Sequence, residues 1–171
     1  KDAQLIHEGQ SSDVQSFGYA DRNGTQNYIF IYRSITFYTS QKFIWVDNKM
    51  ITLDIPEDSD LNGILNNQLI VQLKSDWTVN SIIYKTGTLL SLNFTELLKG
   101  NKDVQVILTP DEFSSISGVS TTKNRLLLNV LTNVTNQLYI YSFENGTWTS
   151  KKVIAPELGT ISLGSTDEFS D

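Results

Sequence analysis

The chain repeats itself with a period of roughly 40 to 50 residues, and this constrains its fold more than any other feature. Ile116-Ser117-Gly118-Val119-Ser120-Thr121 matches Ile161-Ser162-Leu163-Gly164-Ser165-Thr166, 45 positions further along. Asn67-Gln68-Leu69-Ile70-Val71 likewise matches Asn124-Arg125-Leu126-Leu127-Leu128. Repeats of this length are typical of architectures in which each unit buries its apolar faces against its neighbours, β-propellers among them.

Within each unit, apolar residues recur with a period of two, which predicts β-strands. The turn dipeptides Asn23-Gly24, Asp47-Asn48 and Asn145-Gly146 favour tight hairpins, because their residues tolerate positive φ. The clearest expected strands are 28–32, 43–46, 51–55, 69–73, 89–92, 104–108, 126–130 and 138–141.

One short segment, 94–100, predicts a helix of about one and a half turns. Thr95 is its expected N-cap, and Gly100 is expected to end it. We interpret this helix as a connector between strands.

A proline follows the last apolar run of each unit, at Pro56, Pro110 and Pro156. At this position its missing N–H removes no hydrogen bond between strands. Residues 1–171 are therefore expected to be all-β, as a single piece of a β-propeller. We expect about three four-stranded antiparallel blades at 14–56, 61–110 and 114–156, and the start of a next blade at 158–171, with its inner strand beginning near Ile161. In each unit a short inner strand rich in small residues is expected to precede a strongly apolar second strand, the place that 28–32 takes in the first unit. A β-sandwich is the alternative, but it does not predict the repeated positions.

Composition excludes several classes of function. The net charge is −6 and the 13 Lys and Arg do not cluster, which argues against a nucleic-acid partner. No apolar run approaches the roughly 18 residues of a membrane-spanning helix, so no membrane role is expected. The chain has no Cys, which fits a cytoplasmic or a periplasmic location equally well and leaves the compartment open. No cofactor is expected.

Four separated stretches carry a resemblance to a known family: 30–40, 72–79, 122–131 and 155–160. In this order they resemble the N-terminal propeller of a bacterial branch of the prolyl oligopeptidase family of serine peptidases. The resemblance implies a seven-bladed propeller that caps an α/β-hydrolase domain of the same protein and lets only short peptides reach a serine nucleophile. It also implies that the Ser, Asp and His of that triad lie outside this chain.

The chain alone is not expected to be catalytic. It contains no G-x-S-x-G elbow, the nearest approach being 159–164, and its one histidine is His7. We therefore expect a non-catalytic segment that gates access of oligopeptide substrates and packs on the catalytic domain. The alternatives are a propeller that only binds a protein or glycan ligand, and a propeller with its own catalytic channel.

Three residues are candidates for substrate binding. Trp77 follows an apolar strand and leads into a loop, where the rim of a propeller carries contacts. Arg33 and Arg125 adjoin the strongest strands and are positioned to pair with a carboxylate at an interface. The alternative for all three is a packing role or a solvated strand end.

Asp58, Asp60 and Asn62, followed by Gly63, space oxygen ligands as a calcium loop does. Leu69 stands where an EF-hand carries its bidentate Glu, so the alternative is a plain acidic loop.

A last expectation concerns assembly: exposed apolar faces on the outermost blades favour self-association.

Overall fold

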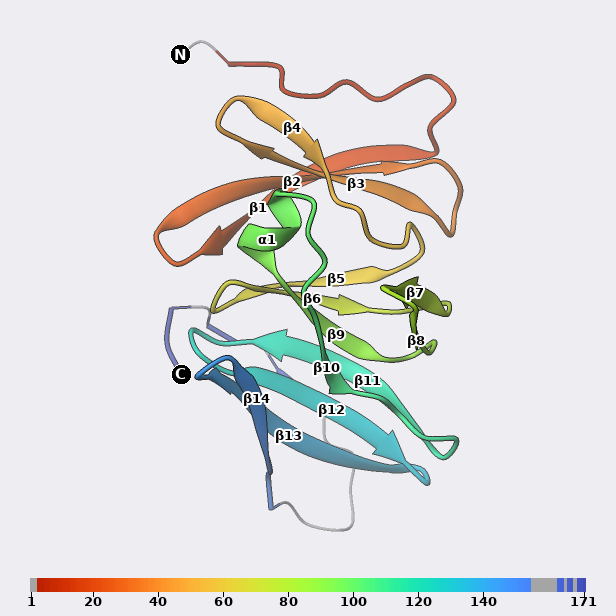
Figure 1. The fold of residues 1–171 in the computed structure, drawn as a ribbon, viewed down its shortest axis with the longest axis vertical. Coiled ribbons are helices and arrows are strands. Elements are labelled where there is room, and N and C mark those ends of the chain that lie inside the picture. The colour runs from red at the N-terminus through yellow and green to blue at the C-terminus, as the bar shows by residue number, and fades with distance from the viewer. Residues whose placement is uncertain (1–2, 155–162, 165, 168) are drawn as a thin grey trace.

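The computed structural model describes residues 3–154, 163–164, 166–167 and 169–171. In this part of the chain, the strands form three four-stranded antiparallel sheets and one two-stranded hairpin, which follow one another down the long axis in Figure 1. The expected all-β, partial propeller-like fold is confirmed. No helix in the described residues is long and apolar enough to span a bilayer.

Each four-stranded sheet is a unit of the sequence repeat. The first contains β1 (Gln15–Asn23), β2 (Gln26–Ser34), β3 (Ser40–Val46) and β4 (Lys49–Thr52) in chain order. The second contains β5 (Asp60–Leu65), β6 (Gln68–Gln72), β9 (Leu89–Asn93) and β10 (Val104–Leu108). The third contains β11 (Ser114–Thr121), β12 (Leu126–Thr132), β13 (Thr135–Glu144) and β14 (Thr147–Lys152).

A hairpin of β7 (Trp77–Val79) and β8 (Ile82–Tyr84) interrupts the second unit between β6 and β9. Sequence patterning missed it, because both strands are only three residues long. The blade borders at 14–56, 61–110 and 114–156 remain a proposal. The inner strand expected near Ile161 lies outside the described residues.

The first strands of the three sheets lie side by side, with β5 between β1 and β11. Gly63 of β5 lies at this approach. A Cβ built there would make ordinary van der Waals contacts, 3.5 Å from Asp21 Oδ2 and 4.0 Å from Thr121 Oγ1, so it is the backbone φ of +92°, and not a lack of space, that favours glycine. The first strands are therefore placed where the sheets converge, as the small residues in them predicted.

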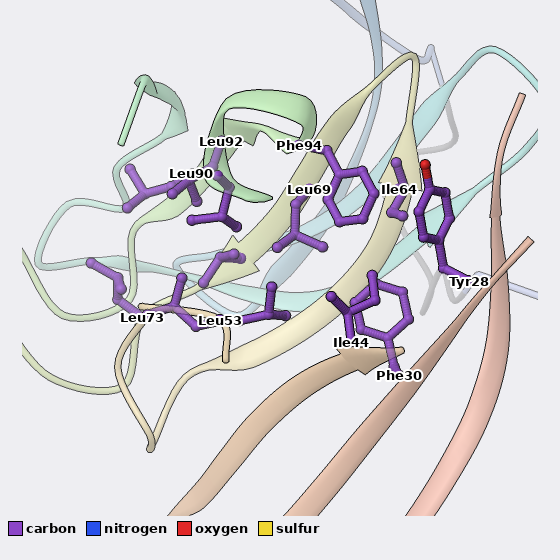
Figure 2. Packing of buried hydrophobic residues seen from close by; sticks show 13 residues of the cluster. Tyr28, Phe30, Ile44, Leu53, Ile64, Leu69, Leu73, Leu90, Leu92 and Phe94 are labelled. Carbon is purple, nitrogen blue, oxygen red and sulfur yellow. The ribbon is translucent and has the colours of Figure 1, made fainter. Parts of the chain in front are cut away.

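The core lies in two layers, one on each face of the middle sheet (Figure 2 shows the first). Leu69, Val71, Leu90 and Leu92 belong to one buried cluster with Phe30 and Ile44 of the first sheet. Ile70 and Leu89 belong to the other cluster, with Leu126 and Leu128 of the third sheet. Because both faces are buried, β6 and β9 are continuous apolar runs without the alternation of a half-exposed strand.

The helix α1 (Phe94–Leu98) follows β9 directly and packs on the first core layer. Its N-cap is Asn93, whose side chain accepts from Glu96 N, so the expectation of Thr95 as the cap was wrong. Thr95 lies one position inside the helix and its hydroxyl donates to Asn67 instead. Gly100 closes the helix at φ +88°, as expected.

The strand expected at 51–55 ends earlier, at Thr52.

Phe94 is the side chain through which α1 joins the two sheets. It is fully buried, meets the ring of Tyr28 edge-on at 4.9 Å and lies 6.3 Å from the ring of Phe30. We expect Phe94→Ala to lower the free energy of unfolding by about 3–5 kcal/mol, measured by chemical denaturation. Phe37→Ala is the matched control, because Phe37 is 88% exposed and its loss should change stability by less than about 0.5 kcal/mol.

Candidate functional site

Because neighbouring strands are antiparallel, the connections within the three sheets gather at two opposite ends. We call the end that carries the first-to-second-strand turns the turn end; these turns follow Asn23, Leu65 and Thr121. The loop end carries the second-to-third-strand connections, which follow Ser34, Gln72 and Thr132. In Figure 1 the turn end lies at the left, near the C-terminus, and the β7–β8 hairpin marks the loop end at the right.

The turn end is polar and hollowed. A cavity of about 580 Å³ lies between the three turns. Arg22 and Lys123 bring positive charge to it, and Asp21 brings one negative charge. The guanidinium of Arg22 lies over the ring of Phe169, 4.9 Å from its centroid. The remaining lining residues are Asn23, Gly24, Ile64, Asn66, Asn67, Thr121, Thr122 and Asn124.

An amide network joins the first two sheets at the turn end. Asn67 Oδ1 accepts from Asn23 Nδ2 at 2.9 Å and from Thr95 Oγ1 at 2.9 Å. Asn67 Nδ2 donates to Asn93 Oδ1 at 3.2 Å, and its backbone N–H donates to Asn23 Oδ1 at 3.1 Å. One turn residue therefore holds together the first sheet, the second sheet and the start of α1.

The third turn holds a carboxylate. Asp171 Oδ1 accepts from Thr122 Oγ1 and from the backbone N–H of Asn124, both at 2.7 Å. Asp171 Oδ2 accepts from Asn124 Nδ2 at 2.8 Å. These hydrogen bonds, from Asn124 foremost, hold the pKa of the Asp171 side chain below its usual value, and the charge of Arg125 acts in the same direction.

The loop end is apolar. Phe37 is 88% exposed and Tyr38 87% exposed in the loop between β2 and β3, and Val134 is 93% exposed in the turn between β12 and β13. Ile82 and Ile83 of the β7–β8 hairpin are also exposed. Val134 has φ +61°, a conformation that β-branched residues rarely adopt. Exposed apolar side chains gathered at one end are typical of surfaces that contact another molecule or domain.

Trp77 lies at the start of β7 and is half-buried. It lines a cavity of about 540 Å³ together with Asp54, Glu57 and Asp76. Lys102 pairs with Asp54, and its ammonium lies 5.9 Å from the centroid of the Trp77 ring. Trp77 therefore begins a short strand, and Lys102 lies within cation–π distance of its ring. Substrate binding at Trp77 stays a prediction.

Arg33 anchors the segment before β1 onto the first sheet. Its Nε donates to Asp13 Oδ1 and Oδ2 at 2.9 Å, and its Nη2 donates to Gln10 Oε1. Burial alone would raise the pKa of Asp13, but hydrogen bonds from Gln10 and Arg33 outweigh it and lower the pKa. Arg33 therefore pairs with a carboxylate of the segment before β1, and substrate binding at Arg33 stays a prediction.

Arg125 is the last residue of the turn between β11 and β12, at the turn end. Its guanidinium donates to Ser142 Oγ and lies 3.7 Å from Glu144 Oε1. Both partners belong to β13 of the same sheet. Its charge also helps to lower the pKa of Asp171, the carboxylate held by the third turn.

Asp58, Asp60 and Asn62 lie at the start of the second sheet. Asp60 pairs with Lys74 at 2.7 Å, so an ammonium already neutralises one of the three expected oxygen ligands. Asn62 Nδ2 is buried without a hydrogen-bond acceptor. Across the residues that the structure describes, His, Asp and Glu side chains do not gather in threes as a metal site would require. Calcium binding at this loop stays a prediction.

Lys42 is a buried ammonium that sequence reasoning did not single out. It is 3% exposed, and its Nζ donates to the backbone oxygens of Ser40, Pro56 and Glu57 at 3.3, 3.1 and 2.8 Å. Burial lowers its pKa, while the nearby carboxylates of Asp58, Asp60 and Glu57 act in the opposite direction. All three donors are used on the chain itself, so Lys42 locks the segment after β4 onto β3.

Comparison with known proteins gives relatives of one kind. No family model matches the chain. It is 31% identical over 175 residues to an uncharacterized peptidase of Sinorhizobium fredii, across 97% of this chain. It is 29% identical over 133 residues to an uncharacterized peptidase of Rickettsia prowazekii, across 74% of this chain. The chain spans 24% and 18% of the lengths of these two relatives.

A solved structure extends the likeness to three dimensions. The structure of a post-proline cleaving enzyme from Rickettsia typhi superposes with a TM-score of 0.67 and 32% sequence identity. The match covers 75% of this chain and 20% of that enzyme. Both sequence and fold are therefore shared with part of a much longer peptidase.

The Asn67 network generates a stability prediction. Asn66 and Asn67 both have positive φ, so Gly fits the backbone at either position, and Asn67→Gly removes only the amide. We expect Asn67→Gly to lower the free energy of unfolding by about 1–3 kcal/mol, measured by urea denaturation. Asn66→Gly, at the exposed neighbouring position, is the control. Equal denaturation midpoints for the two variants would contradict a stabilising network.

Proposed function

Because the chain belongs to the prolyl oligopeptidase family, as part of its N-terminal domain, we propose that it is a non-catalytic segment of a serine peptidase that cleaves short peptides. In this proposal it packs on an α/β-hydrolase domain of the same protein and limits which substrates reach that domain. The shared sequence and fold with the post-proline cleaving enzyme carry the proposal.

The chain's own residues support a role without catalysis. It has one histidine, His7, whose ring stacks beside Phe43 at 6.3 Å. That contact attaches the segment before β1 to the first sheet. Trp148, a further aromatic, uses its indole N–H on Ser91 Oγ at 2.8 Å and so joins the third sheet to the second. These side chains serve packing between sheets.

The loop end supports the docking part of the proposal. Phe37, Tyr38 and Val134 expose apolar surface there, whereas the turn end is lined by amides, hydroxyls and charges. Water disfavours exposed apolar side chains, and the unusual backbone of Val134 is of a kind that is concentrated at functional surfaces. We propose that the loop end faces the catalytic domain and that the turn end faces incoming substrate.

Gating follows from this orientation. The first strands β1, β5 and β11 run from the loop end to the turn end, and β5 lies beside both β1 and β11. A peptide passing along these strands would meet a narrow path, which an unfolded short peptide fits and a folded protein does not. Trp77, on the hairpin at the loop end, is the proposed contact for such a peptide.

The proposed function is tested with the full-length protein on quenched fluorescent peptides that contain one proline. We expect cleavage of short peptides, inactivation by a serine-reactive phosphonate, and no cleavage of a folded protein carrying the same site. Phe37→Ser combined with Tyr38→Ser should weaken domain packing and raise the rate on the longest peptides several-fold. Leu5→Ser is the control, because Leu5 is 76% exposed but precedes the sheets.

Two results would contradict the proposal. Absence of proline-directed cleavage, with binding of peptide or glycan intact, would favour a propeller that only binds. An unchanged length preference in the Phe37 and Tyr38 variant, equal to that of the Leu5 variant, would remove the loop end as the docking surface.

Self-association is proposed for the chain by itself. On the face of the third sheet away from the core, Leu127 pairs with Ile140, and both are half-buried. We expect concentration-dependent oligomers in sedimentation velocity, because this apolar face is open to a second copy. Ile140→Lys should shift the chain toward the monomer, whereas Thr149→Lys, at an exposed position of β14, should not. A strict monomer at all concentrations would contradict this proposal.

A further inference from the structure

The third turn at the turn end holds a carboxylate with donors of three kinds. A backbone N–H and a side-chain amide of Asn124 and the hydroxyl of Thr122 all point at the two oxygens of Asp171, at 2.7 to 2.8 Å. Short contacts of this kind are typical of charge-assisted hydrogen bonds. Both oxygens are engaged at once, which a single surface contact does not achieve.

Two of the turn's hydrogen bonds do not involve the segment that carries Asp171, whereas Lys123 N–H donates to the carbonyl of Ser170 at 3.1 Å. Thr122 N–H donates to the carbonyl of Arg125 at 2.9 Å, and Arg125 N–H donates to Thr122 Oγ1 at 3.2 Å. These bonds close the turn and fix the Thr122 hydroxyl. The turn's own hydrogen bonds orient the hydroxyl and the backbone N–H. A carboxylate therefore binds with little further loss of conformational freedom in the turn.

The surroundings favour an anion over a neutral group. Arg125 closes the same turn, and its charge helps to lower the pKa of Asp171. Lys123 and Arg22 line the adjoining cavity, against the one carboxylate of Asp21. In a chain of net charge −6, the presence of Arg22, Lys123 and Arg125 at the turn end is a local departure from the acidic whole.

The cavity beside the turn has room for more than a carboxylate. Its volume of about 580 Å³ lies within the roughly 300–1,000 Å³ usual for ligand sites. Asn66 and Asn67 line it with amides, and Phe169 contributes an apolar ring. A peptide segment of a few residues has the matching chemistry, a carboxylate attached to backbone amides.

We propose that the turn 122–125 is a recognition site for the carboxylate of a short peptide, and that Asp171 is its internal occupant, which the peptide displaces. The identification of the ligand as a peptide rests on the proposed function; the carboxylate site itself rests on the geometry of the turn. Occupation by Asp171 makes the site selective, because a ligand binds only if it competes with the tethered carboxylate.

Calorimetry on the chain tests this with three probes: acetyl-Ala-Pro-Ala as the free acid, the same peptide as its C-terminal amide, and acetyl-Glu-Pro-Ala amide. Asp171→Ala empties the site. We expect this variant to bind the free acid about tenfold or more tighter than the amide, since hydrogen bonds to a charged group are lost with the amide. Wild-type chain should bind the acid about tenfold more weakly than Asp171→Ala.

The matched variant is Asp171→Ala combined with Asn124→Ala, checked for the same thermal midpoint as Asp171→Ala. It should lose the preference for the acid; if it does not fold, Thr122→Val in the Asp171→Ala background replaces it. Tight binding of the Glu peptide amide would identify a side-chain carboxylate as the ligand of the same site. Equal binding of acid and amide by Asp171→Ala, or no binding of either, would overturn the inference.

These outcomes are separable from the peptidase proposal, because the measurement involves no hydrolysis. A full-length protein that cleaves prolyl peptides while Asp171→Ala ignores carboxylates would remove this site alone. Carboxylate binding in a protein without peptidase activity would remove the proposed function and leave the site.

Discussion

The burial of the middle sheet on both faces is the constraint on which the other sheets depend. Side chains alternate between the two faces of a strand, so a sheet that is apolar on both faces must lie between two other layers. The first sheet and α1 cover one face, and the third sheet covers the other. Neither outer sheet is enclosed in the same way, and each therefore keeps one half-exposed face.

An apolar pattern on both faces leaves the strand register open, because a slip of one residue exchanges one apolar set for another. Two buried polar residues fix the strand register. Ser91 donates to Gln68 Oε1 at 3.0 Å and accepts from the Trp148 indole at 2.8 Å, so β9 must present Ser91 toward the third sheet. The same register puts Leu92 and Phe94 on the opposite layer. Polar groups thus specify an arrangement that the apolar core stabilises.

Most of the strands and the repeat could be predicted from the sequence, because both appear as a periodic pattern of apolar residues. Tyr28 to Tyr32, Leu69 to Val71 and Leu126 to Val130 each occupy the second strand of a sheet, the position that the repeat predicted. The sequence was insufficient for the β7–β8 hairpin, which is too short to show a period. It also misplaced the cap of α1, because Thr95 and Asn93 are equally good cap residues and only the position of Asn67 decides between them.

The candidate site was harder to foresee, because its residues look like ordinary turn residues. Asn67 has φ +61°, and Asn is common there for backbone reasons alone. Once the backbone has placed these amides at one end, their hydrogen-bonding groups point between sheets or into the cavity that they line. Asn67 uses its amide to join two sheets, while Asn124, its counterpart in the repeat, uses its amide on a carboxylate. The same repeat position therefore stabilises the fold in one unit and holds an anion in another, a difference that only the neighbouring segment determines.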